Sequence, residues 1–401
     1  MNVVIVGNGL AGTLAAKTIR ELDDNVEIEI FGEERYPYYP RPNLIEYLAG
    51  RLPSTKLFAF PEGWAERQRI VVRLGEKVTR IRPGERKIET VSGLERFYDV
   101  LLLATGARAA LPRVEGIAQP GVFVLRTLDD ANGLIDHLGT HKRVAVLGGG
   151  LLGLEIARAI RSRDAEVSVI EYFDRLLPRQ LDPAAAAILK SHFEKSGISV
   201  RLATVVKEVL GSGAVQGLRF ESGDRLEADT VIVATGIVPE VGPAKDAGLE
   251  VGRGIVVDDL LRTSVPTVFA AGDVAEHRGR IHGIIPAAFE QARAAAYGML
   301  GRDKPYGGTV PFNTLKVAGL YLTSVGEIDA LGEGYEALVR SLPEAGLYKK
   351  IVLRGGRLVG GIWMGTKKGA AEISRLVAVE KHVEALKKDL LEDDFDFSEI
   401  T

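Results

Sequence analysis

The feature that most constrains this chain is a glycine turn that occurs twice, each time between an apolar strand and a helical segment. Residues 2–12 read NVVIVGNGLAG and residues 143–153 read RVAVLGGGLLG. In both places a second apolar segment follows the helical one, at 26–31 and at 166–171. A strand, a G-x-G-x-x-G turn, a helix and a second strand predict a parallel βαβ unit. Two copies predict two related α/β domains in one chain.

The three glycines of such a turn have different tasks. The first allows the tight turn, the second lets a pyrophosphate approach the backbone, and the third lets the helix pack closely on the strand. The phosphates then lie at the positive end of the helix dipole. One copy is also compatible with a simple packing turn, whereas two copies in this context predict two bound dinucleotides. The candidate residues are Gly7, Gly9, Leu10, Ala11 and Gly12 in the first copy, and Gly148, Gly150, Leu152 and Gly153 in the second.

An acidic residue at the end of the second strand distinguishes the two copies. The second copy ends at Glu171, where a carboxylate bonds the ribose hydroxyls of an adenosine and repels a 2′-phosphate. This favours NADH over NADPH, although Arg175 is near enough in sequence to soften the preference. In the first copy Gly32 stands at the expected place, so Glu33 is the candidate for the ribose and Glu34 is the alternative.

Two further stretches repeat and indicate how the domains are connected. Residues 100–112 (VLLLATGARAALP) and 230–240 (TVIVATGIVPE) each contain an apolar strand that ends in Ala-Thr-Gly before a crossover with proline. We interpret them as the exits of two related domains, and the simplest arrangement inserts one domain into the other. The predicted first domain comprises residues 1–108 and 239–310, and the second comprises 109–238. The exits add Ala104, Thr105, Gly106 and Gly236 to the candidate cofactor-binding residues.

After residue 310 the pattern changes. Residues 347–365 alternate around a central Gly-Gly and predict a hairpin. Residues 370–391 predict an amphipathic helix, and the acidic residues 392–401 predict an extended tail. The predicted fold is therefore α/β, with two Rossmann-like dinucleotide-binding domains, the second inserted in the first, and a small C-terminal α+β domain of residues 311–401.

A further apolar strand, in residues 267–276 (TVFAAGDVAE), ends next to an acid. Asp273, directly after Gly272, stands where a carboxylate can bond a cofactor hydroxyl. The alternative is that Asp273 caps the N-terminus of a helix. A helix is predicted to begin at Pro286, followed by Ala287, and its N-terminus favours negative charge on a bound cofactor.

Composition excludes several classes of protein and site. The net charge of −3 argues against nucleic acid as a partner, and no apolar run of 18 residues predicts a membrane span. The apolar start lacks a basic segment and fits a buried strand better than a signal peptide, so we expect a cytoplasmic protein. The chain has no cysteine, which excludes disulfides, thiolate nucleophiles and cysteine-bound iron or zinc. Six Asn and five Gln beside many Glu, Arg and Lys favour a thermophilic source.

Taken in order, the motifs GNGLAG, PYYPRPNL, ATGA, GGGLLGLE, ATGIVP and AAGDVAE resemble those of the flavoprotein reductases of the pyridine nucleotide oxidoreductase superfamily, which have the glutathione-reductase-like fold. The resemblance covers residues 1 to about 325. Within the superfamily the chain is most similar to NADH:rubredoxin oxidoreductases and to the flavin-binding front part of NADH nitrite reductases. The resemblance implies FAD on the first domain and NAD(H) on the second. It also implies hydride transfer from NADH to flavin N5, followed by single electrons to a rubredoxin- or ferredoxin-type carrier.

The resemblance also assigns roles to individual residues. It implies that Arg41 lies near the polar parts of FAD, that the backbone of Val78 meets the adenine, and that Asp273 bonds the ribitol or phosphate region. Glu155 would face the nicotinamide and the flavin. Lys316 would lie by the flavin N1–C2 edge and stabilise the reduced form; the alternative is that it reaches water from a strand edge.

The chain departs from the family pattern in two places. Without cysteine it lacks the redox thiols of the disulfide reductases, which excludes disulfide or peroxide reduction by that route. Related ferredoxin reductases read RPPLSK, and Glu46 here stands in place of the lysine that pairs with the acid equivalent to Glu155. Glu46 and Glu155 are therefore predicted to form a carboxylate pair near the flavin, in which one group titrates above its usual range. The alternative makes Glu46 a solvated helix residue.

The sequence does not identify the protein that accepts the electrons. Rubredoxins and ferredoxins are usually acidic, so we expect a basic docking face. The hairpin region offers Lys349, Lys350, Arg354, Arg357, Lys367 and Lys368, which can equally be an ordinary solvated surface. Two other functions stay open: an NADH oxidase that reduces oxygen at the flavin, and an electron-entry or NADH-sensing subunit of a larger redox complex. The protein itself is expected to be a monomer or a homodimer.

Overall fold

The structure is a computed structural model that describes residues 1–309, 312–317 and 319–400, without the side chains of 312–317, 398 and 399. The chain folds into two compact units, each assembled from separate stretches of sequence. The first unit comprises Met1–Ala109, Arg126–Leu128 and Ile237–Thr309. The second unit comprises Ala110–Leu125, Asp129–Gly236 and Val310–Thr401. The division into three domains with the boundaries given above stays a prediction.

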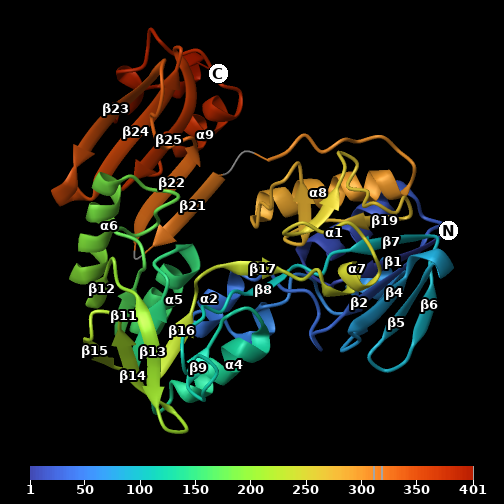
Figure 1. Cartoon of the computed structure of the whole chain (residues 1–401). Helices are drawn as coiled ribbons and strands as arrows, with labels where there is room; N and C mark the ends of the chain where they lie inside the picture. The colour runs from blue at the N-terminus through green and yellow to red at the C-terminus, as the bar shows by residue number, and fades with distance from the viewer. Residues whose placement is uncertain (310–311, 318, 401) are drawn as a thin grey trace. The chain divides into compact units, whose positions relative to one another are not determined.

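The first unit is built on a five-stranded parallel sheet (Figure 1). Its order is β19 (Val268–Ala270), β7 (Val100–Leu103), β1 (Asn2–Val6), β2 (Glu27–Gly32) and β3 (Ile70–Leu74). The central strand β1 is almost completely buried, as expected for a Val- and Ile-rich strand in the middle of a parallel sheet. The predicted first βαβ unit is confirmed.

Helices α1 (Leu10–Leu22) and α8 (Ile285–Met299) contact each other in the first unit. Both helices are rich in buried alanines, small side chains that allow two helix axes to approach closely: Ala15, Ala16, Ala292, Ala295 and Ala296. Pro286 lies in the first turn of α8, so the predicted start of this helix is confirmed to within one residue.

Smaller elements complete the first unit. A three-stranded antiparallel sheet consists of β4 (Val78–Arg82), β5 (Lys87–Thr90) and β6 (Glu95–Phe97), and a two-stranded ribbon consists of β8 (Ala107–Ala109) and β17 (Ile237–Pro239). The remaining elements are α2 (Asn43–Leu48), α3 (Trp64–Arg67), α7 (Gly242–Asp246), β18 (Ile255–Val257) and β20 (Ala275–His277).

The second unit repeats four of the five strands of the first sheet in the same order, and the fifth, an edge strand, comes from a different point of the chain. Its parallel sheet has the order β12 (Ile198–Arg201), β11 (Glu166–Ile170), β10 (Arg143–Leu147), β16 (Thr230–Val233) and β9 (Val122–Phe123). The central strand β10 lies between β11 and β16, as β1 lies between β2 and β7. Three helices and an antiparallel sheet accompany it: α4 (Leu128–His137), α5 (Leu151–Arg161), α6 (Pro183–Lys195), and β13 (Val206–Gly211), β14 (Val215–Phe220) and β15 (Arg225–Glu227).

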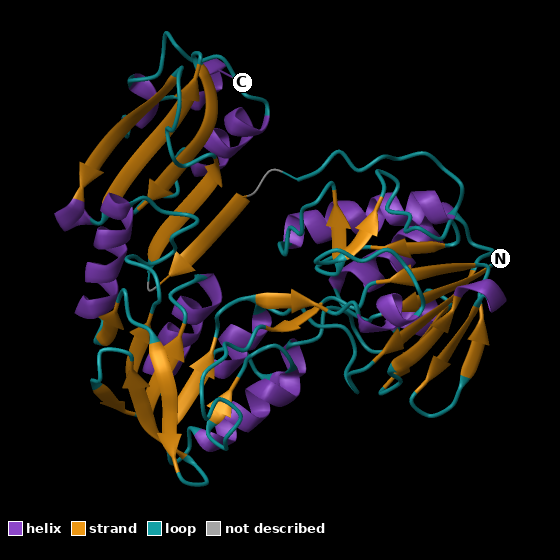
Figure 2. Ribbon diagram, in the orientation of Figure 1, coloured by secondary structure: helices purple, strands orange, loops and turns teal. Residues whose placement is uncertain are grey.

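The C-terminal part of the second unit is an antiparallel sheet accompanied by helix α9 (Ala370–Ala378) (Figure 2). Short 3-10 turns lie at Pro343–Ala345, Asp389–Leu391 and Phe397–Ile400. Its order is β21 (Phe312–Val317), β22 (Leu320–Gly326), β25 (Arg357–Met364), β24 (Leu347–Arg354) and β23 (Tyr335–Leu342). The predicted hairpin is confirmed as β24 and β25. Its turn residues Gly355 and Gly356 have φ of 55° and 73°, the backbone region that glycine tolerates best.

The predicted helix over residues 370–391 is wrong beyond Ala378. Glu380 has a φ of 45°, which ends the helix, and the chain then pairs with β25. The Leu358 N–H donates to the Lys381 carbonyl, and the Val383 N–H donates to the Gly356 carbonyl, both at 2.9 Å. Val383 and Leu390 are buried without α-helical geometry, so the same apolar residues that suggested a helix serve an irregular segment.

The predicted extended tail is also wrong. Phe397 and Ile400 are buried in the cluster that includes Leu376 and Val377 of α9. Two acids of this segment pair with cations: Asp393 with Lys349 at 2.6 Å and Arg340 at 2.9 Å, and Glu392 with Arg340 at 2.5 Å. Within the described residues, no helix is both long enough and apolar enough to cross a lipid bilayer.

Candidate dinucleotide sites

The first glycine turn has two glycines that packing requires and one that it does not. Gly7 has a φ of +117°, and a Cβ on it would come within 2.1 Å of the Ala104 carbonyl oxygen. A Cβ on Gly12 would come within 2.0 Å of the Gly7 oxygen. A Cβ on Gly9 would meet no atom within 4 Å. Gly9 therefore borders open space that the fold itself does not use.

That open space lies at the N-terminus of α1. Gly9 is the N-cap residue, no side chain caps the helix, and no acidic residue occupies its first turn. The first backbone N–H groups of a helix have no partner within it, and the helix dipole places partial positive charge there. The turn thus fits a phosphate-bearing ligand in both shape and charge.

The second turn has the same geometry. Gly148 has a φ of +114° and a Cβ position 2.5 Å from the Ala234 oxygen, and the Cβ position of Gly153 lies 2.0 Å from the Gly148 oxygen. A Cβ on Gly150 would again meet nothing within 4 Å, and no side chain caps α5. Leu152, in the first turn of α5, is exposed. The second unit therefore carries a second cradle for a phosphate-bearing ligand.

The Ala-Thr-Gly exits also share their geometry. The Thr105 hydroxyl donates to the Glu240 carbonyl at 2.8 Å, and the Thr235 hydroxyl donates to the Ala110 carbonyl at 2.7 Å. The glycines that follow, Gly106 and Gly236, have φ of +70° and +118°. Each threonine thus fixes, within its own unit, the crossover that leaves the parallel sheet next to the glycine turn.

Glu171 lies directly after β11, beside the second turn. It is only 6% exposed, and its carboxylate accepts the N–H groups of Gly149 at 2.5 Å and Phe173 at 2.8 Å. The carboxylate is thus fixed by the backbone at the edge of the cradle. The guanidinium of Arg175 donates to the carbonyls of Leu181 and Pro178, within its own loop.

In the first unit the two acids after β2 have different partners. Glu33 is exposed and pairs with Lys77 at 2.9 Å. Glu34 accepts hydrogen bonds from the hydroxyl of the buried Tyr39 and, at 2.5 Å, from Arg41. Burial raises the pKa of Tyr39 far above its usual value, although Arg41 lowers it in part, so the hydroxyl stays neutral. The guanidinium of Arg41 is therefore held in place by an acid of its own unit, and its contact with FAD stays a prediction.

A short segment from residue 126 to residue 128 brings a further arginine into the first unit. The Tyr39 hydroxyl accepts the Leu128 N–H at 2.8 Å, and Arg41 donates to the Arg126 carbonyl at 2.7 Å. Arg126 then donates to the Ala107 carbonyl at 2.9 Å and to the Asp273 carboxylate at 2.8 Å. The network thus links the segments around residues 34–41, 107, 126–128 and 273.

Asp273 leads into β20 and not into a helix, so the alternative that it is a helix cap is wrong. Its position is set by Gly272, which has a φ of +86° and donates its N–H to the side-chain oxygen of the buried Gln291 at 2.8 Å. Tyr39, Arg126 and Gln291 were missed in the sequence. No signal in the sequence distinguished Gln291, because the neighbouring Glu290 and Arg293 of α8 are also polar and only the folded chain shows that Gln291 is the buried one.

Two other predicted contacts lie in regular elements. Val78 is buried at the start of β4, where its backbone pairs with Thr90. Pro286 and the buried Ala287 form the first turn of α8, which no side chain caps. Their contacts with a cofactor stay predictions.

The three catalytic candidates lie in separate elements. Glu46 of α2, in the first unit, pairs with Arg51 at 2.6 Å, and Glu155 of α5, in the second unit, pairs with Arg158 at 3.1 Å. Each carboxylate thus has an arginine on its own unit, and the proposed pairing of Glu46 with Glu155 stays a prediction. Lys316 lies in β21 opposite Tyr321, and its side chain is outside the described residues.

The predicted basic docking face is wrong at its two central residues. Lys349 and Lys350 are only 2% and 7% exposed. Neighbouring residues of a strand point to opposite faces of the sheet, and here an acid covers each of them. Lys349 pairs with Asp393 at 2.6 Å, and Lys350 pairs with Asp182 at 2.9 Å. Neither lysine can meet a partner protein.

The four other basic candidates are exposed, namely Arg354, Arg357, Lys367 and Lys368. Arg354 pairs with Glu327 and Glu380, and Lys368 donates to the Asp393 carbonyl at 2.5 Å. A docking role for this smaller set stays a prediction.

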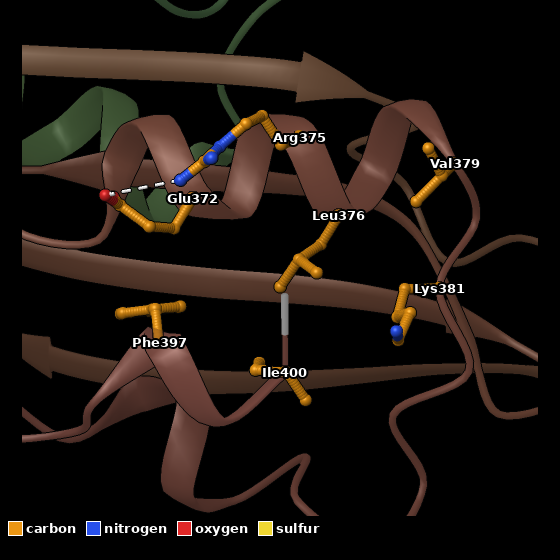
Figure 3. Close-up of a pocket in the computed structure, with 7 residues that line it drawn as sticks. All are labelled: Glu372, Arg375, Leu376, Val379, Lys381, Phe397 and Ile400. Carbon is orange, nitrogen blue, oxygen red and sulfur yellow. Dashed lines mark ion pairs between the residues drawn. The ribbon is translucent and has the colours of Figure 1, made fainter.

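A cavity of about 170 Å³ lies between α9 and the last turn of the chain (Figure 3). Leu376, Val379, Phe397 and Ile400 give it an apolar lining, and at its edge Arg375 pairs with Glu372 of the same helix at 3.7 Å. None of the candidate cofactor or catalytic residues lines it, so we do not identify this cavity with either dinucleotide site.

Two protein-family models together match most of the chain. The model described as pyridine nucleotide-disulphide oxidoreductase matches residues 1–296, and that of the rubredoxin NAD+ reductase C-terminal domain matches residues 311–381.

The chain is similar to curated proteins of two sizes. It is 34% identical to an NAD(P)H nitrite reductase of Bacillus subtilis, over 96% of this chain and 48% of the relative. It is 33% identical to a rubredoxin-NAD(+) reductase of Pseudomonas putida, over 84% of this chain and 89% of the relative. The chain therefore spans about half the length of the nitrite reductases that it matches.

The fold of the chain is also similar to solved structures of reductases. The covalent putidaredoxin reductase–putidaredoxin complex matches with a TM-score of 0.90 at 28% identity, over 100% of this chain and 97% of that one. The NADH:rubredoxin oxidoreductase of Clostridium acetobutylicum matches with a TM-score of 0.81 at 27% identity, over 96% of both chains.

Proposed function

The chain belongs to the pyridine nucleotide-disulphide oxidoreductase family, and from this premise we propose that it is an NADH-dependent FAD oxidoreductase that passes electrons to a small rubredoxin- or ferredoxin-type protein. The observation that carries the proposal is the pair of glycine turns. In each, the outer glycines are required by packing, while the middle glycine faces open space at an uncapped helix N-terminus. A chain with two such cradles has places for two dinucleotides.

The residues present fit the two cofactors. In the first unit the turn of Gly7, Gly9 and Gly12 would hold the FAD pyrophosphate, and Arg41, Arg126 and Asp273 would present charged groups to it. In the second unit Gly148, Gly150 and Gly153 would hold the pyrophosphate of NADH, and Glu171 its ribose. Bound FAD supplies hydride acceptance and one-electron release. With no cysteine in the chain, no protein disulfide takes part.

The proposal is tested by isolating the protein and titrating it with NADH without oxygen. We expect a yellow protein with about one FAD per chain that NADH bleaches in a stoichiometric titration. Rubredoxin, ferredoxin and oxygen are then offered in parallel, and fast reoxidation by one of the protein carriers supports the proposal. A protein that takes up no FAD when it is supplied would contradict it.

Nearly the whole chain matches less than half of each of two nitrite reductases. This partial match favours a second candidate function, an electron-entry part of a larger redox enzyme. This candidate predicts that the isolated chain is reduced by NADH but reoxidises slowly with every small carrier and with oxygen. The NADH oxidase alternative predicts the reverse, rapid NADH turnover in air without a carrier. We expect the protein to act in the cytoplasm, as a monomer or homodimer.

Replacing Glu171 with glutamine is expected to narrow the preference for NADH over NADPH by about tenfold or more, because charged hydrogen bonds contribute roughly 1.5–3 kcal/mol. Glutamine keeps an oxygen that can accept the Gly149 or Phe173 N–H, so the fold should survive. The measurement is kcat/KM for both nucleotides. Arg175→Gln is the matched control and should change the ratio little, since its guanidinium is bound within its own loop. An unchanged ratio in the Glu171 variant would remove this residue from the ribose site.

Lys316→Met is expected to retain FAD, lower the flavin midpoint potential and slow reduction by NADH. A cation near reduced flavin is worth on the order of 4 kcal/mol at 4 Å and an effective dielectric of 20, before desolvation. Lys316→Arg should recover part of the potential. The measurement is a redox titration of the bound flavin, with Lys207→Met, an exposed lysine in β13, as control. A methionine variant with wild-type potential would return β21 to a purely structural role.

A further inference from the structure

The loop directly after Glu171 presents two large aromatic side chains to solvent. Tyr172 is 65% exposed and Phe173 is 50% exposed. Their rings contact each other edge to face, with centroids 5.2 Å apart and an interplanar angle of 89°. By contrast, Phe193 of α6 in the same unit is completely buried. Packing of the second unit therefore accounts for Phe193 but not for the exposed pair.

The backbone under the two rings is fixed on both sides. The Phe173 N–H donates to the Glu171 carboxylate at 2.8 Å, and the Phe173 carbonyl accepts the Ala203 N–H at 2.8 Å. The Glu171 carbonyl accepts the Thr204 N–H at 3.0 Å. The rings are thus held at a defined place beside the acid, as a recognition surface requires.

The order of groups in a dinucleotide matches the order of features along this edge of the sheet. The proposed pyrophosphate site is at Gly150 and the proposed ribose site at Glu171, and the adenine is the next group beyond the ribose. The next residues after Glu171 are Tyr172 and Phe173. An edge-to-face pair leaves ring faces open, and a flat π surface of this kind stacks well on a nucleobase.

We propose that Tyr172 and Phe173 form the platform on which the adenine ring of the nicotinamide cofactor stacks. The inference rests on the proposed function, because it assigns the base of the nucleotide whose phosphates and ribose the second unit holds. The two residues contribute to affinity through the ADP half of the cofactor alone. Neither residue takes part in the redox chemistry.

The test is calorimetric binding of ADP-ribose and of nicotinamide mononucleotide to the FAD-loaded protein. The double variant Tyr172→Ala, Phe173→Ala is expected to bind ADP-ribose about tenfold to a hundredfold more weakly, from the usual contribution of aromatic stacking. Its affinity for nicotinamide mononucleotide should not change. Tyr172→Phe keeps the ring and should bind ADP-ribose like the wild type. Because both side chains are exposed, thermal unfolding of the variants should match the wild type.

Phe97→Ala is the matched control, since Phe97 is an exposed aromatic residue in β6 of the first unit. It should leave the affinity for ADP-ribose unchanged. A double variant that binds ADP-ribose as tightly as the wild type would overturn the inference and leave the proposed function intact. A wild-type protein that binds FAD but neither ADP-ribose nor NADH would overturn both.

Discussion

Replacing Gly9 with alanine is expected to give a correctly folded protein that no longer retains FAD. The added methyl group would meet no protein atom within 4 Å, and Gly9 has a φ of −92°, which alanine adopts without strain. The methyl group would instead occupy the space through which a pyrophosphate approaches the backbone. We expect the affinity for FAD to fall by on the order of a hundredfold, or about 2.7 kcal/mol. The measurements are flavin absorbance per chain and thermal unfolding of the apoprotein.

The matched variant in the same turn is Gly7→Ala, which should fail for the opposite reason. Its Cβ would overlap the Ala104 carbonyl oxygen at 2.1 Å, at a φ of +117°. The strained backbone alone costs about 1–3 kcal/mol, so the apoprotein should be destabilised before any cofactor is added. A Gly9→Ala protein that still carries one FAD per chain would show that the first turn does not hold the pyrophosphate. Gly150→Ala, in the second turn, should stay yellow and lose affinity for NADH.

Replacing Lys350 with methionine is expected to destabilise the second unit by about 3–5 kcal/mol, the usual cost of leaving one partner of a buried ion pair unmatched. Its partner Asp182 caps α6 by accepting the Ala185 N–H, and it also accepts the Tyr348 hydroxyl at 2.6 Å. The methionine would leave this carboxylate with neutral partners only. Urea unfolding monitors the loss, and the exposed Lys388→Met serves as control. The double variant with Asp182→Asn should recover part of the stability.

The ion pair of Lys350 and Asp182 should make the stability of the second unit fall at acid pH. Burial raises the pKa of Asp182, but hydrogen bonds from Lys350, Tyr348 and Ala185 outweigh it and hold the pKa below its ordinary value. The stabilisation is therefore complete above the unfolded pKa of about 3.9 and is lost as the pH falls through the lower folded value. In Lys350→Met the acid limb of the stability profile should move to higher pH. An unchanged profile would show that the pair contributes nothing.

The two glycine turns could be predicted from the sequence because their constraints are local. The close approach of Gly12 to Gly7, and of Gly153 to Gly148, follows from a turn of fixed length between strand and helix. The Ala-Thr-Gly exits could be recognised for a similar reason, since each repeats beside its own turn. A structural constraint that involves only about a dozen consecutive residues can be predicted from the sequence of those residues alone.

The parts that could not be predicted depend on contacts between distant residues. Lys350 and Lys349 look like surface cations in an alternating strand, and only the folded chain brings Asp182 and Asp393 to them. Arg126 lies in a stretch assigned to the inserted domain, yet its hydrogen bonds with Ala107 and Asp273 hold it in the first unit. The apolar residues of 379–391 are spaced as in a helix, yet they lie in an irregular segment whose backbone pairs with β25.

The interleaving of the two units along the chain has a consequence for the order in which a ribosome completes them. When residue 236 has been made, all five strands of the second parallel sheet exist, whereas the first sheet still lacks β19. Helix α8 also comes later, so the alanine-rich α1 lacks this partner until residues 285–299 emerge. The parallel sheet that begins the chain is therefore finished second. During synthesis its nascent edge at β7 and the bare face of α1 are the surfaces that a chaperone would have to protect.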